Sequence, residues 1–130
     1  MIGASEGVDR EKIVLIVDDE IHIQQSLALF LTEEGFQVKK ASNGQEALDF
    51  LRSQTFKTCL VLLDLMMPVK GGFEFRVEQL QDPTISEVPI AIMSAGRLSP
   101  ELLREMVPQE ILAKPFSLDQ LLVTVGRYYR

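Results

Sequence analysis

Short apolar runs alternate along the chain with segments in which apolar residues recur at helical spacing, and this alternation limits the possible folds more than any other feature. The first run, residues 13–17, is continuous and rich in β-branched residues, as is typical of a strand buried on both faces. Strands that alternate with helices favour a parallel sheet with right-handed crossovers. We therefore expect an α/β fold with a single doubly wound, five-stranded parallel sheet, whose strands lie at residues 13–17, 36–41, 60–63, 89–93 and 110–113.

The helical segments between these runs carry recognisable end signals. The first contains apolar residues at helical spacing and stops at Gly35. Asn43 and Glu46 predict a capping box for the second helix, and Ser99 and Ser117 predict N-caps for the fourth and fifth. In the third and fifth helices we expect these residues to form the buried faces: Phe73, Val77 and Leu80, and Leu118, Leu121, Leu122 and Val125.

Length and charge narrow the class of protein. A chain of 130 residues is expected to form one domain, at residues 12–130, behind a flexible lead-in at residues 1–11. The net charge of -6 and the pI of 4.8 disfavour nucleic acid binding, which needs a basic surface. Because no signal peptide and no apolar span of about eighteen residues is present, we expect a cytoplasmic protein without membrane association.

Charged and hydroxyl side chains stand where the buried strands would stop. Asp18 and Asp19 follow the first run and Asp64 follows the third, while Ser94 and Lys114 follow the fourth and fifth. In an open parallel sheet the ligand crevice lies outside the carboxyl ends of the strands. We therefore expect these five side chains to converge in one pocket.

The residue types in this pocket point to phosphoryl chemistry with a metal ion. Neighbouring carboxylates raise each other's proton affinity unless a cation neutralises them, and Mg²⁺ prefers carboxylate and phosphate oxygens. A further carboxylate can act as a nucleophile that forms an aspartyl phosphate. Lysine and serine can bind the oxygens of a phosphoryl group during its transfer. The pattern therefore predicts a magnesium and phosphoryl site.

The chain resembles the receiver domains of two-component response regulators, from Lys12 to about Tyr129. The chemotaxis member of that family has the strand order 2-1-3-4-5, so the resemblance implies this order and a flavodoxin-like receiver fold. Any one of the matching stretches is weak alone, but the ordered set with these separations is specific. The stretches are Val17-Asp18-Asp19-Glu20, Asp64-Leu65-Met66-Met67-Pro68 followed by Gly72, Met93-Ser94-Ala95, and Lys114-Pro115-Phe116.

The resemblance implies a role for each acid. Asp64 is expected to accept a phosphoryl group from a phosphohistidine on a histidine kinase or a phosphotransfer protein. Asp19, Asp64 and the backbone carbonyl of Met66 are expected to bind Mg²⁺ directly, with Asp18 acting largely through a coordinated water. The domain would then phosphorylate and dephosphorylate itself without turning over external substrates.

The resemblance also implies a phosphorylation-dependent switch. Lys114 and Ser94 are expected to bind phosphoryl oxygens, and the small Ala95 leaves the phosphorus accessible. Contact with Ser94 is expected to change the face formed by the fourth helix, the fifth strand and the fifth helix, which would bind an unknown downstream protein. The Lys114–Pro115 peptide bond is expected to be cis. The family usually has an aromatic switch residue where this chain has Ile111, so we expect its switching to be built differently.

Two alternative functions remain open at this point. A phosphohydrolase of the haloacid dehalogenase kind would carry a second aspartate two residues after the nucleophile, where this chain has Met66. A pseudo-receiver, which binds a partner without phosphorylation, would lack an acid, the lysine or the acceptor, and none is missing. A nucleotide-binding domain is a more distant candidate, because no glycine-rich phosphate loop follows the first strand. Within the main hypothesis, the chain is either a stand-alone receiver or one excised from a larger protein.

Overall fold

The computed structural model describes residues 10–67 and 69–130, so most of the expected lead-in, residues 1–9, and Pro68 of the motif lie outside the described residues. In the described part, five parallel strands form one sheet in the order β3-β2-β4-β5-β6. Counted along the chain this is the order 2-1-3-4-5, which confirms the expected fold. The strands are β2 (Lys12–Val17), β3 (Val38–Ala41), β4 (Lys57–Asp64), β5 (Ile90–Ser94) and β6 (Glu110–Ala113).

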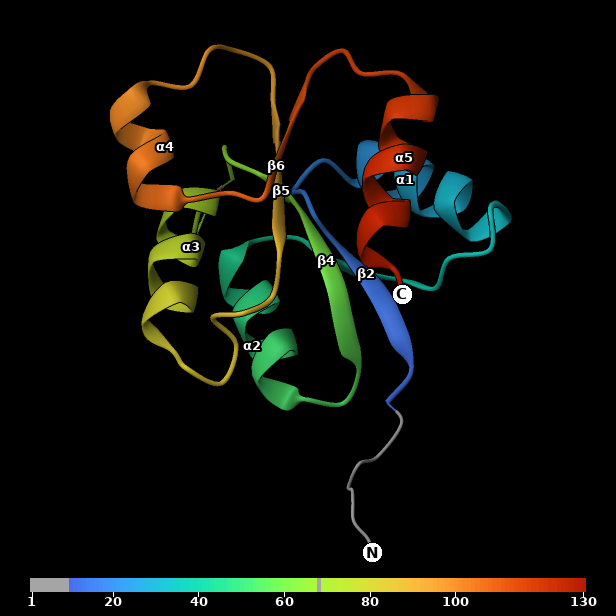
Figure 1. Ribbon diagram of the computed structural model, residues 1–130, viewed down its shortest axis with the longest axis horizontal. Helices are drawn as coiled ribbons and strands as arrows, with labels where there is room; N and C mark the ends of the chain where they lie inside the picture. Colours follow the sequence, from blue (N-terminus) through green and yellow to red (C-terminus); the bar gives the residue numbers. More distant parts are fainter. Residues whose placement is uncertain (1–9, 68) are drawn as a thin grey trace, which may run out of the picture.

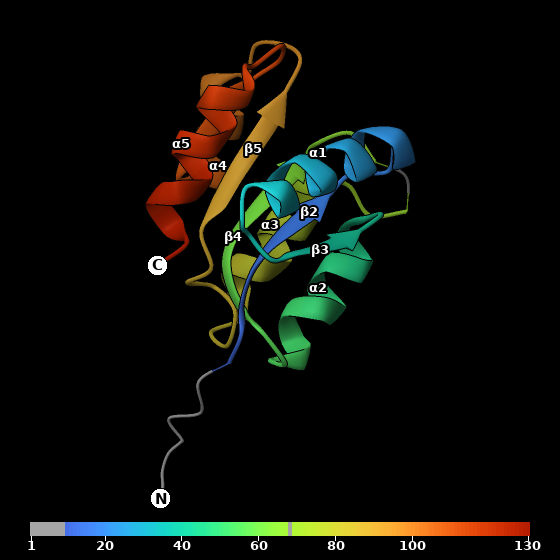
Figure 2. The same ribbon diagram turned by 90° about the vertical axis from the view of Figure 1, so that its right-hand side faces the viewer.

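Helices cover both faces of the sheet. In Figure 1, α1 and α5 lie on one side of the strands and α2, α3 and α4 on the other. Figure 2, viewed from the side of α1 and α5, shows the strand arrows pointing toward the same end of the molecule. The helices are α1 (Ile21–Glu33), α2 (Gly44–Ser53), α3 (Gly72–Gln81), α4 (Pro100–Met106) and α5 (Leu118–Tyr128).

The β-branched run at the start of the chain forms a central strand because both of its faces are apolar. Val14 and Ile16 pack in the cluster beneath α1 and α5, whereas Ile13, Leu15 and Val17 pack in the cluster beneath α2, α3 and α4. All five side chains are fully buried. The alternation anchors β2 from both sides and fixes the place where the chain leaves the sheet at residue 18.

The end signals of the helices act largely as expected. The Ser117 hydroxyl and the Gln120 side chain form a reciprocal capping box at α5, and Ser99 caps α4. Asn43 caps α2 by accepting from the Glu46 N–H, but the Glu46 carboxylate accepts from the Ser42 N–H, so the expected box is only half formed.

The buried faces expected for α3 and α5 were wrong in part. Leu80 is 38% exposed and Leu118 is 52% exposed. The buried face of α3 carries Phe75, together with Arg76 and Gln79, which reach backbone carbonyl groups on neighbouring segments.

Over the described ranges, none of the helices combines the length and the apolar character that crossing a bilayer requires.

Candidate functional site

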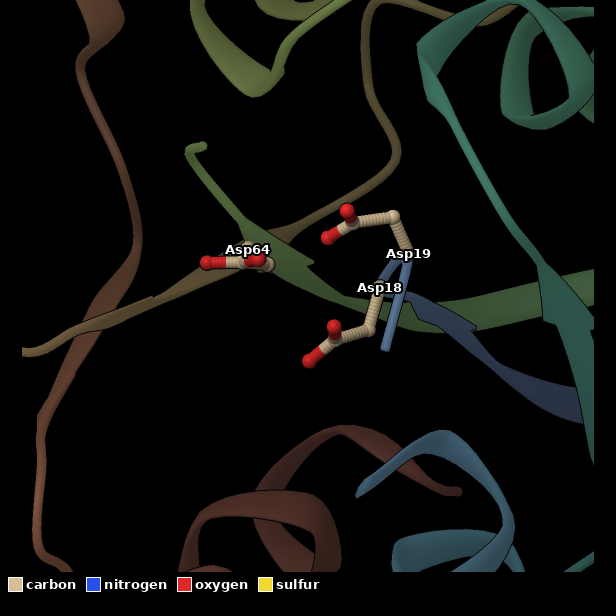
Figure 3. A group of neighbouring side chains, drawn as sticks. All are labelled: Asp18, Asp19 and Asp64. Carbon is tan, nitrogen blue, oxygen red and sulfur yellow. The ribbon is translucent and has the colours of Figure 1, made fainter. Parts of the chain in front are cut away.

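Three carboxylates converge at the carboxyl end of the two central strands. Asp18 and Asp19 directly follow β2, and Asp64 ends the neighbouring β4. Because Val17 pairs with Leu63, the next residues along the two strands, Asp18 and Asp64, stand side by side. One oxygen from each of the three acids lies within 4.8 Å of the others. Figure 3 shows the three carboxyl groups directed to the same side of the strand ends; we call them the acid cluster.

Asp18 is the buried member of the acid cluster, with 1% of its surface exposed. Its Oδ1 atom accepts a hydrogen bond from the Glu20 N–H at 2.9 Å, whereas Oδ2 is buried and has no partner among the described residues. Burial is the main cause that raises the pKa of the Asp18 carboxyl group. A buried carboxylate oxygen without a donor is costly by itself, and a cation between the acids, or a water bound to that cation, would satisfy it.

Asp64 lies between the other acids and a lysine. Burial and the charge of Asp18 raise the pKa of the Asp64 carboxyl group, while Lys114 and the Met66 backbone N–H oppose that shift. The Lys114 Nζ atom lies 3.9 Å from Asp64 Oδ1. This lysine directly follows β6, where its N–H donates to the Ser94 carbonyl oxygen at 2.7 Å. The Lys114–Pro115 bond is cis, the isomer that the resemblance implied.

The loop after Asp64 is held by backbone contacts. The Gly72 N–H, at the start of α3, donates to the Leu65 carbonyl oxygen at 3.0 Å, and the Gly44 N–H donates to the Lys70 carbonyl oxygen at 2.7 Å. The Met66 side chain is 82% exposed. Its backbone N–H forms a hydrogen bond with the Asp64 carboxyl group. The loop is therefore anchored at its far end to α2 and α3.

Ser94 and Ile111 are not members of the acid cluster. The Ser94 hydroxyl donates to the Gly96 carbonyl oxygen at 3.0 Å, and no hydrogen bond joins it to Asp64 in the part of the chain that the structure describes. Ala95 is exposed beside it. Ile111 lies on β6 with 47% of its surface exposed. The structure thus brings together the three acids and Lys114, while the Ser94 hydroxyl forms a hydrogen bond within its own loop.

Sequence reasoning missed one buried polar residue at this site. The Gln24 side chain, on α1, donates to the carbonyl oxygens of Asp18 at 3.1 Å and Ala41 at 3.0 Å. A signal was available, because Gln24 precedes Leu27 and Leu31 by three and seven residues and so belongs to the buried face of the helix.

Comparison with known proteins agrees with this geometry. The family model described as "Response regulator receiver domain" matches residues 14–126. The response regulator RR06 of Streptococcus pneumoniae is 36% identical over 122 residues, which cover 89% of this chain and 54% of that protein. The chain spans about half the length of the curated relatives it matches.

Solved structures show the same fold at similar levels of identity. The chemotaxis protein CheY4 of Vibrio cholerae superimposes with a TM-score of 0.77 and 32% identity, covering 92% of this chain and 98% of that one. The response regulator TrrA of Thermotoga maritima, solved in complex with Mg²⁺-BeF, gives a TM-score of 0.76 with 30% identity and covers 91% of this chain and 98% of that one.

Proposed function

The chain belongs to the response regulator receiver domain family, and we propose from this premise that Asp64 accepts a phosphoryl group in a two-component phosphorelay, with Mg²⁺ as cofactor. The observation that carries the proposal is the acid cluster, whose oxygens lie within 4.8 Å of one another beside Lys114. Acids this close favour a divalent cation as their partner. We place the domain at residues 12–130, a range that contains the whole family match.

Asp19 and Asp64 would hold the ion together with the backbone carbonyl of Met66, and Asp18 would act through a bound water. When bound, Mg²⁺ neutralises the acids and offsets the charge of the incoming phosphoryl oxygens. The fit is supported by the unpartnered, buried Oδ2 atom of Asp18 and by the oxygen-only donor set. Oxygen donors are those that Mg²⁺ prefers.

Asp64 would supply the nucleophile. One of its carboxylate oxygens forms a bond to the phosphorus of a phosphohistidine, and the phosphorus–nitrogen bond breaks. The electron pair of that bond stays on the imidazole, which takes up a proton and leaves as neutral histidine. Lys114, already 3.9 Å from the carboxylate, would balance the charge on a phosphoryl oxygen. Hydrolysis of the aspartyl phosphate would return Asp64 to its starting state.

Ser94 would carry the signal outward. By exchanging its hydrogen bond to Gly96 for one to a phosphoryl oxygen, it would draw the loop after β5 toward Asp64 and change the face formed by α4, β6 and α5. We propose this face as the surface for an unidentified downstream protein. Exposed apolar side chains support the assignment: Val107, Ile111, Leu118 and Val123.

A neighbouring groove supports a protein as the phosphoryl donor. It has a volume of about 460 Å³ and borders Lys114, on the side of the sheet covered by α1. Its wall is apolar, so it could receive an apolar side chain of a histidine kinase or phosphotransfer protein that presents its histidine to Asp64. The remaining lining residues are Ile23, Leu27, Met93, Ala95, Pro115 and Phe116.

The experiment is incubation with acetyl phosphate, followed by intact-mass measurement, with and without Mg²⁺. The wild type should gain one phosphoryl group only with Mg²⁺, and Asp64→Asn should gain none. Asp49→Asn, at an exposed acid on α2, is the matched control and should react like the wild type. Labelling of Asp64→Asn at the wild-type level would refute the acceptor assignment, and rapid release of phosphate from monoesters would favour a phosphohydrolase.

A further inference from the structure

A buried amide braces the backbone next to the acid cluster. Gln24 Nε2 directs its two N–H groups at the carbonyl oxygens of Asp18, at 3.1 Å, and Ala41, at 3.0 Å. Only 3% of the Gln24 surface is exposed, so water does not compete for these bonds. One side chain on α1 thus joins the chain segment that follows β2 to the end of β3.

Asp18 is held at three points by this arrangement. Its N–H donates to the Ala41 carbonyl oxygen at 3.1 Å, its carbonyl oxygen accepts from Gln24, and its Oδ1 atom accepts from the Glu20 N–H. The Asp18 carbonyl belongs to the peptide unit that joins Asp18 to Asp19. Any rotation of that unit would therefore change the directions of two carboxylates at once.

Repulsion within the acid cluster opposes the arrangement that the Gln24 hydrogen bonds hold in place. Asp18, Asp19 and Asp64 carry like charges, which favour opening of the chain segment after β2. A lysine or arginine could hold the same carbonyl groups, but its charge would oppose a cation between the acids. A neutral amide supplies two donors without that penalty.

We propose that Gln24 is a positioning residue for the magnesium site, a role that rests on the proposed function of the acid cluster. It acts through the Asp18 carbonyl, holding Asp18 and Asp19 in the directions that bring their oxygens within 4.8 Å of Asp64. Without the two Gln24 donors, all three acids remain, but the Asp18 and Asp19 carboxyl groups adopt a wider range of orientations.

The test compares two buried glutamines that have the same kind of contact. Gln79, on α3, also donates through Nε2 to two backbone carbonyl groups, those of Ile85 and Val88, both at 2.9 Å. Both glutamines lie on the buried face of a helix, Gln24 on α1 and Gln79 on α3. Only Gln24 donates to a member of the acid cluster. Replacing either residue by methionine removes the donors and keeps the side-chain length. Gln79 Oε1 also accepts a hydrogen bond from the buried Arg76 guanidinium at 2.6 Å, so Gln79→Met should lose at least as much stability as Gln24→Met. A purely structural role therefore predicts that Mg²⁺ affinity falls no further in Gln24→Met than in Gln79→Met.

Mg²⁺ affinity is measured by isothermal titration calorimetry on the wild type, Gln24→Met and Gln79→Met, together with the urea midpoint of unfolding. We expect both variants to unfold at lower urea, but only Gln24→Met to bind Mg²⁺ more weakly, by about tenfold, as is common for residues behind metal ligands. If Gln24→Met does not fold, Gln24→Asn is measured in its place. Its shorter amide cannot bridge both carbonyl groups, so weaker Mg²⁺ binding is again expected.

Two results would overturn the inference while leaving the proposed function intact: Mg²⁺ affinity of the folded Gln24 variant equal to that of the wild type, or an equal loss in Gln79→Met. A wild type that binds no Mg²⁺ would overturn the inference together with the proposed function. The wild-type titration therefore separates the two failures before any variant is compared.

Discussion

A side-chain carbon on Gly72 would lie 2.6 Å from the backbone carbonyl oxygen of Asp64, because the first turn of α3 packs directly against the end of β4. The same carbon would lie 2.8 Å from the Cα atom of Leu65. Both neighbours are backbone atoms that cannot swing aside as a flexible side chain can. The end of β4, which carries the proposed acceptor, and the first turn of α3 can therefore pack this closely only with glycine at residue 72.

Gly72→Ala should lower the free energy of unfolding by about 1–3 kcal/mol, because the added methyl group displaces the backbone around Asp64. Gly126→Ala is the control: position 126 lies in α5 with no atom within 4 Å of the added carbon, so alanine should raise stability by about 0.5–1 kcal/mol. Urea unfolding measures both. Equal stability changes in the two variants would show that the contact at Gly72 does not constrain the loop.

Asp18→Asn should stabilise the protein without metal at neutral pH, by about 1 kcal/mol, or a few degrees in Tm. Burial raises the pKa of Asp18 above the ordinary carboxyl value of about 4. The folded state therefore binds the proton more tightly than the unfolded state, and this stabilising contribution is lost as pH rises through the raised pKa.

The check is the Tm of Asp18→Asn and wild type from pH 4 to pH 7 in a chelator. The advantage of the variant should grow with pH, and saturating Mg²⁺ should reduce it by stabilising the wild type. The exposed Asp49→Asn should show no such trend. An advantage independent of pH would mean that the charge of Asp18 is not the cause.

The convergence of the site could be predicted because it follows from where the strands end and from their order in the sheet. Asp64 ends β4, Asp18 directly follows the neighbouring β2, and Lys114 directly follows β6, so the strand ends and the strand order suffice to place them on one edge. The strand order itself came from the family resemblance. Spacing of apolar residues found every helix and strand to within a few residues at most ends.

Other features depend on tertiary contacts that spacing does not contain. Leu80 has an apolar side chain and is 38% exposed, whereas the polar residues Arg76 and Gln79 of the same helix are buried. Their polar groups are satisfied by carbonyl groups brought close only when the chain folds. Gln24 is the same case on α1. A polar residue in phase with buried apolar residues is the sequence signal for such contacts.

Lys114→Ala should leave Mg²⁺ affinity nearly unchanged, or slightly higher, while slowing phosphorylation by acetyl phosphate about 10²–10³-fold. The acids remain in place, but the positive charge 3.9 Å from Asp64 is lost where the phosphoryl oxygens would arrive. Calorimetry measures the first quantity and timed intact-mass spectra the second. The exposed lysine in Lys40→Ala provides the control. Parallel loss of metal binding and phosphorylation in Lys114→Ala would assign the lysine a structural role.

Arg76→Met should destabilise the fold by about 2 kcal/mol. The buried guanidinium donates to the carbonyl oxygens of Met106 and Val107, at 2.7 and 2.8 Å, and so ties α3 to the end of α4. Its removal leaves these groups without their donor, although the cost of burying the charge is also removed. In Arg104→Met, an exposed arginine on α4 is lost, and urea unfolding should change by less than about 0.5 kcal/mol. Equal losses of stability in Arg76→Met and Arg104→Met would show that the Arg76 hydrogen bonds do not hold α3 to the end of α4.

The most direct measurement asks which carboxylate carries the phosphoryl group. After reaction with acetyl phosphate and Mg²⁺, borohydride reduces an aspartyl phosphate to homoserine, and peptide mass spectrometry locates the changed residue. Asp64, flanked by the other acids and by Lys114, should be converted, with no conversion at Asp18 or Asp19 and none anywhere without Mg²⁺. Homoserine at Asp18 or Asp19, or its absence from position 64 in a protein that has gained a phosphoryl group, would contradict the account.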